Sequence, residues 1–406
     1  MSASTWIRGP IGIDAHARVT RPGCRTVLVV IPTLTAGTRL FELVPLLESD
    51  RRVQVLFTVP ETTDTWHGLD TYVRAQGGLV LPWHQAARHE YDLVLAASHR
   101  HLEQLRGPIL LVPHGAGAMK SLRFSRKAGA PTLPATGLDR ELLTYRGRLL
   151  PAALAVSTDS EYDALRTLCP EALPVALVSG DMCLDRMMAS RDRRSEYRRA
   201  LGVEGGQRLV TVSSTWSVDS AFGRLPGLCR ALLDALPAPD SAVAAVLHPN
   251  IWTVHGHRQV LTWLGDCVAE GLRLIPPDRG WQATVLASDW VVGDHGSTTA
   301  YAAATGVPVT LATRSPDVRQ GSIADVVAGL APCLDLSRPL AVQAEEAEAV
   351  SGELAAATSA AITSRPGQAA DILGRAMYRL LRLSPPEAWS APHPVPAPVP
   401  VTPVVS

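Results

Sequence analysis

The sequence predicts an α/β protein built on two parallel sheets, each with helices on both faces. Short runs of β-branched and aliphatic residues alternate with amphipathic stretches along most of the 406 residues. Apolar strands joined by helices are typical of parallel sheets, because both faces of such a sheet are buried. The pattern starts again near residue 208, after an arginine-rich stretch. This restart predicts two successive doubly wound domains, with their ligands at the carboxyl ends of the strands.

The first set of elements shows the alternation clearly. The apolar runs that we expect to form strands are 26–31, 53–59, 79–81, 91–96, 109–112, 152–156 and 175–178. The amphipathic stretches that we expect to form helices are 36–47, 68–76, 99–106 and 159–168. In the first of these helices, leucines recur at the three- and four-residue spacing of one helix face.

The second set repeats the pattern with different residues. Its expected strands are 208–212, 243–247, 272–275, 290–292 and 307–311. Its expected helices are 225–236, 258–269, 281–287 and 297–305, followed by closing helices at 340–363 and 368–383. Pro366 separates the two closing helices, because proline cannot continue a helix.

These patterns set the expected domain boundaries. We expect a flexible leader over 1–24, a first Rossmann-like domain over 25–190 and a second over 205–382. The stretch from Pro385 to the end contains eight of the 32 prolines. Such a segment cannot pack a core, so a disordered, mobile tail over 384–406 is expected, with a partner-binding motif as the alternative.

Composition excludes several classes of function. The 38 Lys+Arg balance the 38 Asp+Glu, which argues against a nucleic-acid partner. The longest apolar runs have the length of strands, so no membrane span is expected, and the N-terminus lacks the apolar region of a secretory signal. We therefore expect a cytoplasmic protein. The six cysteines are scattered singly and His255-Gly256-His257 lacks a third ligand, so no metal site is expected.

The sharpest local motif is Asp294-His295-Gly296-Ser297-Thr298-Thr299. It follows an expected strand and opens an expected helix. Backbone N–H groups and hydroxyls at the positive end of a helix can hold a phosphate. Serine and threonine also cap helices that bind nothing, so the spacing alone leaves both interpretations open.

Three further motifs follow expected strands. The first, Pro113-His114-Gly115 through Lys120, offers a histidine that can act as a base, glycines that admit a ligand, and one of only two lysines. The second is His248-Pro249-Asn250, and the third is Ser213-Ser214-Thr215-Trp216. A structural histidine, a turn and a buried tryptophan are the respective alternatives. Their shared position at strand ends favours a nucleotide-linked ligand held between two domains.

Several nucleotide-binding signatures are missing. The sequence contains no G-x-x-x-x-G-K-[ST] segment, which argues against a P-loop. No G-x-G-x-x-G follows the first strand, where the sequence reads PTLTAG, so a dinucleotide fold has no fingerprint. There is also no D-x-D segment of the kind that metal-dependent nucleotide-sugar enzymes use. We therefore expect neither a metal nor a cofactor.

Taken in order, the motifs resemble the CDP-glycerol glycerophosphotransferases of teichoic-acid synthesis. The matching stretches are His114-Gly115 through Lys120, Gly180 through Arg186, Ser214-Thr215-Trp216, His248-Pro249, and Asp294 through Ser297. They cover about half of the chain, residues 108–312. The resemblance implies a GT-B fold, in which two Rossmann-like domains face a cleft.

The resemblance also implies roles for individual residues. His114 would be the base that activates an acceptor hydroxyl. His248, Ser297 and Thr298 would bind the donor pyrophosphate, and Thr215 would lie close by. Four departures concern the donor: His295 and Gly296 replace a tyrosine and a serine, the acidic residue expected near Tyr301 is absent, and Ser217 stands where an arginine would follow the tryptophan.

The resemblance therefore predicts a metal-independent transferase that moves glycerol phosphate or a sugar from a nucleotide-activated donor to a hydroxyl acceptor. The remaining donor-side residues are Gly115, Lys120, Trp216, Asp294, His295, Gly296 and Thr299. A peripheral membrane contact stays open. One alternative is an enzyme similar to UDP-GlcNAc 2-epimerases, whose closing segment looks alike. Another is a non-catalytic relic of the fold that acts as a binding protein.

Overall fold

The computed structural model describes residues 6–12, 15–17, 19–60, 68–117, 121–123, 132–134, 137–203, 205–389 and 393–402. Its contacts divide the chain into two compact units. Unit 1 comprises Met1–Gly115, Gly137–Cys183 and Ser364–Ala391. Unit 2 comprises Ala116–Thr136, Leu184–Thr363 and Pro392–Ser406. The chain therefore returns to unit 1 and then again to unit 2 after the second set of elements.

Unit 1 contains a sheet of seven strands in the order β11-β10-β5-β4-β1-β2-β3, and every pair is parallel. The strands are β1 (Arg25–Val30), β2 (Val53–Val59), β3 (Val80–Pro82), β4 (Leu93–Ala96), β5 (Ile109–Leu111), β10 (Ala153–Val156) and β11 (Ala176–Val178). Strand β1 lies between β2 and β4, so the winding direction of the chain reverses there. The carboxyl ends beside such a reversal are where ligands bind in open α/β sheets.

The central strand of unit 1 is buried on both faces, as a continuous apolar run predicts. Val27 and Val29 belong to one core cluster, and Leu28 and Val30 to another. Because successive side chains of a strand point to opposite faces, these clusters lie on the two sides of the sheet.

The helices of unit 1 differ from expectation in two places. They are α1 (Leu34–Leu43), α2 (Pro45–Glu48), α3 (Leu69–Ala75), α4 (Trp83–Ala86), α5 (Arg140–Leu143), α6 (Asp159–Leu168) and α17 (Ala369–Leu381). The helix expected at 99–106 is only a short 3₁₀ turn, η2 (Leu102–Gln104). Helix α17, expected in the second domain, packs Met377 and Leu381 into the core of unit 1. Short elements η1 (Ala15–Ala17), η3 (Pro170–Val175), β8 (Thr144–Tyr145) and β9 (Arg148–Leu149) complete this unit.

Unit 2 contains a sheet of five parallel strands in the order β14-β13-β12-β15-β16. The strands are β12 (Arg208–Ser214), β13 (Ser241–Leu247), β14 (Arg273–Ile275), β15 (Trp290–Gly293) and β16 (Val309–Leu311). Here the winding reverses at β12, which lies between β13 and β15. Both sheets thus have the doubly wound topology that the sequence predicts.

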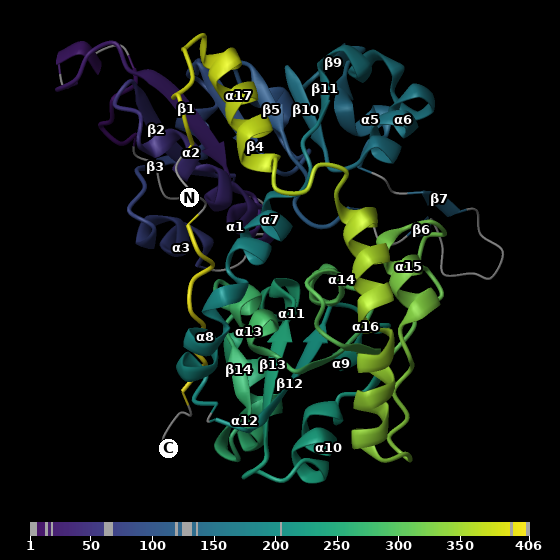
Figure 1. Cartoon of the computed structure of the whole chain (residues 1–406). Helices are drawn as coiled ribbons and strands as arrows, with labels where there is room; N and C mark the ends of the chain where they lie inside the picture. The colour runs from purple at the N-terminus through teal and green to yellow at the C-terminus, as the bar shows by residue number, and fades with distance from the viewer. Residues whose placement is uncertain are drawn as a thin grey trace. The chain divides into compact units, whose positions relative to one another are not determined.

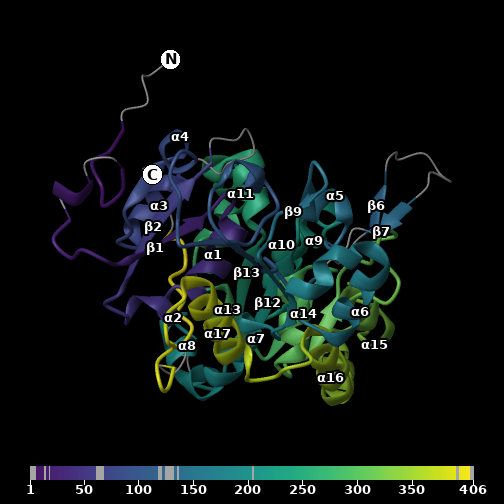
Figure 2. The ribbon, with the colours of Figure 1, turned by 90° about the horizontal axis from the view of Figure 1, so that it is seen from above.

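Helices surround the sheet of unit 2. They are α8 (Arg194–Ala200), α9 (Ala221–Arg224), α10 (Leu228–Ala235), α11 (Pro249–His255), α12 (His257–Ala269), α13 (Trp281–Ala287), α14 (Ser297–Ala304), α15 (Ile323–Leu330) and α16 (Leu340–Ile362). Helices α15 and α16 lie side by side in both views (Figure 1, Figure 2). The unit also contains the turn η4 (Arg191–Arg193) and the hairpin of β6 (Ser121–Arg123) and β7 (Thr132–Pro134). Helix α7 (Met182–Ala189) spans the boundary between the units.

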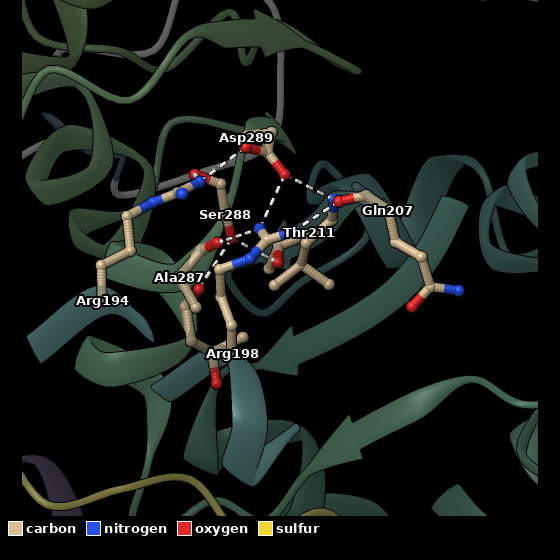
Figure 3. A network of polar contacts seen from close by, with 9 residues as sticks. Arg194, Arg198, Gln207, Thr211, Ala287, Ser288 and Asp289 are labelled. Atoms are coloured by element: carbon tan, nitrogen blue, oxygen red, sulfur yellow. Dashed lines mark hydrogen bonds and ion pairs between the residues drawn. The ribbon is translucent and has the colours of Figure 1, made fainter. Parts of the chain in front are cut away.

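Helix α8 lies in the arginine-rich stretch that precedes residue 208, and hydrogen bonds and ion pairs hold it to unit 2 (Figure 3). Arg194 and Arg198 donate to the two oxygens of Asp289 at 2.6 and 2.8 Å. The backbone N–H of Leu209, on β12, donates to the same carboxylate at 2.7 Å. Arg198 also donates to the carbonyls of Ala287 and Gln207. Two of the three arginines of this helix therefore form ion pairs within unit 2.

Both chain ends correct a sequence-based expectation. In the leader, the backbone N–H and carbonyl of Ile7 bond the side chain of Gln85 at 2.9 Å each, and Ile11 is buried in the core of unit 1. In the tail, residues 393–402 lie along unit 2, with Val395 only 1% exposed. The flexible leader and the disordered tail are thus wrong for the parts that the structure describes, because apolar residues between the polar ones find buried positions.

No helix among the described residues is both long enough and apolar enough to cross a membrane.

Candidate functional site

Three of the predicted motifs come together at the carboxyl edge of the sheet in unit 2. His248 follows β13, Thr215 and Trp216 follow β12, and the segment from Asp294 follows β15. These three strands are neighbours in the sheet, with β12 at the reversal of winding. The structure therefore places the motifs where a doubly wound sheet binds ligands.

Asp294 holds the loops of this edge together, and its side chain points into the protein interior. Its side chain is completely buried, and its carboxylate accepts hydrogen bonds from the backbone N–H groups of three residues. The distances are 2.9 Å to Thr215, 2.8 Å to Ala221 and 3.0 Å to Gly296. Asp294 thus joins the loop after β12, the start of α9 and the start of α14. Its oxygens are directed to the backbone, so its part in ligand binding is to hold the loops.

Thr299 also faces inward, contrary to its expected contact with a donor. It is completely buried, accepts a hydrogen bond from the Asp294 backbone N–H at 3.2 Å and bonds the Ser213 hydroxyl at 3.3 Å. Gly293 makes room for it, since a Cβ there would lie 2.3 Å from the Thr299 hydroxyl oxygen. His295 is buried as well, at 6% exposure. These two buried side chains therefore support the edge from the protein interior.

The backbone N–H groups in the first turn of α14 have no capping side chain. The N-cap residue is Gly296, which has no side chain that could accept a hydrogen bond from them. Helices α1, α6, α9 and α15 of the same chain all have a threonine or serine cap that does accept one. A side chain at 296 would be crowded, because a Cβ would lie 3.0 Å from Thr215 Cβ and 3.1 Å from Asp294 Oδ1.

Two hydroxyls stand beside this open helix start. Ser297 and Thr298 are half-buried, and within the described chain their side chains make no hydrogen bond. A helix N-terminus carries the equivalent of about half a positive charge. The open N–H groups and the two hydroxyls together form a cradle suited to an anion.

His248 has its protonation pattern set by its own helix. It is the N-cap residue of α11, and its Nδ1 accepts a hydrogen bond from the Asn250 backbone N–H at 3.0 Å. A neutral imidazole has one donor and one acceptor nitrogen. The proton of neutral His248 therefore lies on Nε2, which makes that nitrogen a hydrogen-bond donor.

Trp216 is half-exposed next to this histidine. Its indole is 48% exposed, and the two ring centroids lie 6.4 Å apart. The following residue, Ser217, has a φ of 98°, in the region that favours glycine. Gly223 allows this, since a Cβ there would lie 2.3 Å from the Ser217 carbonyl oxygen. An unfavourable backbone conformation thus lies directly after the exposed tryptophan, and such strain is often found at functional sites.

In unit 1, His114 follows β5 at the carboxyl edge of its own sheet. The residue is exposed, yet desolvation by the surrounding protein lowers the pKa of its ring, and electrostatic interactions with His99 and Arg39 lower it further. A hydrogen bond to the Ala97 backbone opposes these effects. The net pKa lies below the usual 6.5, so the ring is neutral and able to accept a proton at pH 7.

Sequence reasoning missed the charged group beside this histidine. Arg39, on α1, donates to Glu42 at 3.1 Å and to Asp181 at 3.3 Å, and all three side chains are at most 8% exposed. Position 39 reads as an ordinary polar residue on a helix, and only the fold shows that it is buried. Gly115 is half-buried directly after His114, whereas Lys120 lies outside the described residues.

No family model matches the chain, and no curated protein sequence matches it either. Solved structures do match. The wall teichoic acid polymerase TagF aligns at 13% identity over 89% of this chain and 90% of its own, with a TM-score of 0.57. MnaA of S. aureus, in a co-structure with UDP, aligns at 13% identity over 91% of this chain and 100% of its own, with a TM-score of 0.51.

A UDP-GlcNAc 2-epimerase from Neisseria meningitidis, bound to UDP-GlcNAc, aligns at 14% identity over 87% of this chain and 100% of its own, with a TM-score of 0.51. At these identities the likeness shows the fold alone. The mixed α/β architecture with parallel sheets of seven and five strands is the GT-B fold that the sequence predicts.

Proposed function

We propose that the chain is a metal-independent GT-B transferase, which moves glycerol phosphate or a sugar from a nucleotide-activated donor to an acceptor hydroxyl. The observation that carries this proposal is the uncapped start of α14, which lies at the same carboxyl edge of the unit 2 sheet as His248. The likeness of the fold to TagF, MnaA and the epimerase supports a nucleotide-linked substrate.

The donor pyrophosphate would lie at the edge of unit 2. The N–H groups at the start of α14, the hydroxyls of Ser297 and Thr298, and Nε2–H of His248 would donate hydrogen bonds to its oxygens. When the bond to the leaving phosphate breaks, negative charge grows on its oxygens. Donors that are already oriented stabilise this charge without reorganisation, which lowers the barrier.

Trp216 and Thr215 border the same edge. The exposed indole face would pack against the sugar or base of the donor, because a flat aromatic surface suits either. The half-buried Thr215 follows β12 directly, and its backbone N–H is bonded to Asp294. The carboxylate thereby fixes the loop that carries the indole.

His114 would take the proton from the attacking hydroxyl. Its lowered pKa keeps the imidazole unprotonated at neutral pH, as a general base requires. An epimerase or hydrolase would instead need carboxylates free to exchange protons. Asp181 and Glu42 are both paired with Arg39, which favours the transferase over that alternative.

A binding panel tests the proposal. Thermal unfolding is measured with CMP, CDP, CDP-glycerol, UDP, UDP-sugars, GDP and dTDP. A ligand at 100 times its Kd adds about 2.7 kcal/mol of stability. His248→Ala should abolish the shift, whereas His255→Ala, on the same helix α11, should retain it. A shift with cytidine nucleotides supports glycerol phosphate transfer, and one with uridine nucleotides supports sugar transfer or epimerisation. No shift with any nucleotide would reject the proposal in favour of a non-catalytic binding protein.

A further inference from the structure

The C-terminal strap, residues 393–402, lies extended along unit 2 in contact with α8 (Figure 1). Its burial repeats every third residue. Val395 and Pro398 are buried and Val401 is half-buried, whereas Pro396 and Val399 are exposed. A polyproline II helix has three residues per turn, so one of its faces is buried at this spacing. The alternating prolines of the strap favour this conformation, because each restricts φ to about −65°.

The first half of the strap is held through its carbonyl groups. Arg186 donates from Nε to the carbonyl of His393 at 2.8 Å and from Nη2 to that of Pro394 at 3.1 Å. The Tyr197 hydroxyl donates to the carbonyl of Val395 at 2.9 Å. Three consecutive carbonyls are thus bonded. A polyproline II helix makes no internal hydrogen bonds, so its carbonyls are free for such contacts.

Val395 is the anchor of this half. Its side chain is 1% exposed, and its backbone N–H donates to the Ser190 hydroxyl at 3.0 Å. Ser190 and Tyr197 are themselves completely buried. The surface under the strap, which we call the groove, is therefore a built site: Val395 is buried in it, and Ser190, Tyr197 and Arg186 bond the backbone around it.

The second half of the strap fits against the edge of the sheet. Pro398 lies against Gly280, where a Cβ would be 2.8 Å from the Pro398 Cα. The backbone N–H of Val401 donates to the Leu274 carbonyl on β14, at 2.8 Å, and its side chain packs on the core of unit 2. Strand β14 is an edge strand, and the strap covers part of its open side.

We propose that this groove is a recognition site for X-Pro repeat peptides in the polyproline II conformation, occupied in this structure by the chain's own C-terminal strap. Proteins that bind proline-rich segments exploit this preformed conformation, because little conformational entropy is lost when it docks. A tethered segment has a high effective concentration, on the order of millimolar for a short linker, so the strap outcompetes dilute peptides. This inference is independent of the proposed transfer reaction.

Two matched valines of the strap test the proposal in the full chain. Val395→Asp places a charge at a buried position, whereas Val399→Asp alters a residue that is 60% exposed. Amide hydrogen exchange over 393–402 should accelerate at least tenfold in Val395→Asp and remain unchanged in Val399→Asp. A labelled peptide with the sequence of 391–402 should then bind Val395→Asp but neither the wild type nor Val399→Asp.

Equal exchange in the two variants would overturn the inference. A released strap without peptide binding at millimolar concentration would also overturn it, because the groove would then hold only a tethered segment. A peptide with aspartate in place of Val395 should not bind. Tyr197→Phe, in the Val395→Asp background, removes one hydroxyl and should weaken peptide binding about two- to tenfold. If Val395→Asp fails to fold, Arg186→Met and Tyr197→Phe alone should accelerate exchange of the strap, and unchanged exchange in both rejects the proposal.

Discussion

Replacement of Asp294 by asparagine should remove the support of the whole donor edge. The carboxylate accepts hydrogen bonds from the backbone N–H groups of Thr215, Ala221 and Gly296, spread over both of its oxygens. Asparagine has nearly the same shape but only one acceptor oxygen. Its amide NH₂ would therefore point at one or two buried N–H donors.

The magnitude follows from the number of bonds affected. A hydrogen bond to a charged group contributes about 1.5–3 kcal/mol, and a buried donor left without an acceptor costs about 1–3 kcal/mol. Asp294→Asn loses the charge on all three bonds and leaves at least one donor unmatched. We expect the free energy of unfolding of unit 2 to fall by about 3–5 kcal/mol.

Urea denaturation combined with amide hydrogen exchange checks this value, because exchange reports the opening of unit 2 separately from that of unit 1. The amides of Thr215, Ala221 and Gly296 should lose their protection. Asp266→Asn, at an exposed position of α12, is the matched control and should change stability by less than about 0.5 kcal/mol. If Asp294→Asn lowers the free energy of unfolding by an equally small amount, the conclusion that Asp294 holds the loops of this edge together is refuted.

The remaining predictions concern the base, the helix start and the α8 ion pairs. His114→Ala should lower turnover about 10²- to 10⁴-fold, with nucleotide affinity retained in calorimetry; unchanged turnover would remove His114 from the role of base. In the wild type, the rate should fall only below the ordinary histidine pKa of 6.5, since the pKa of His114 is lowered, mainly by desolvation. Gly296→Ala should weaken nucleotide binding, because the added methyl would lie 3.0 Å from Thr215 Cβ, whereas Gly265→Ala, with open space around it, should not. Burial by itself raises the pKa of Asp289. The hydrogen bonds that its carboxylate accepts from Leu209, Arg198 and Arg194 outweigh this effect, so the net pKa is lowered. Its stabilising contribution is therefore present above the unfolded-state pKa and is lost as pH falls through the folded-state value. Acid titration of stability should be shallower in Asp289→Asn, and an unchanged slope would contradict the network in Figure 3.

The strands and the fold class could be predicted from the sequence because they depend on local patterns. A run such as 26–31 is apolar without interruption, which indicates a strand buried on both faces wherever it lies in the fold. The position of His248, Thr215 and Asp294 after such runs is also local information. In a parallel sheet it is enough to bring them to one edge, because all strands end on the same side.

The direction of each side chain at that edge depended on long-range contacts. Asp294 and Thr299 belong to one motif with Ser297 and Thr298, yet the first two face the protein and the last two remain available for a ligand. The difference arises because Thr215 and Ala221, more than 70 residues away, present N–H groups that need an acceptor. No local sequence pattern indicates that these two N–H groups need an acceptor at position 294.

The two chain ends show the same division. By itself, the sequence determined that the X-Pro repeat cannot form a helix or a central strand, since proline lacks an N–H group. Only the tertiary structure decided that the repeat is held in place, because Arg186, Tyr197 and the edge of β14 supply the partners that its free backbone groups require. Local propensity restricts the conformations that a segment can adopt, and the surface that the rest of the chain builds selects among them.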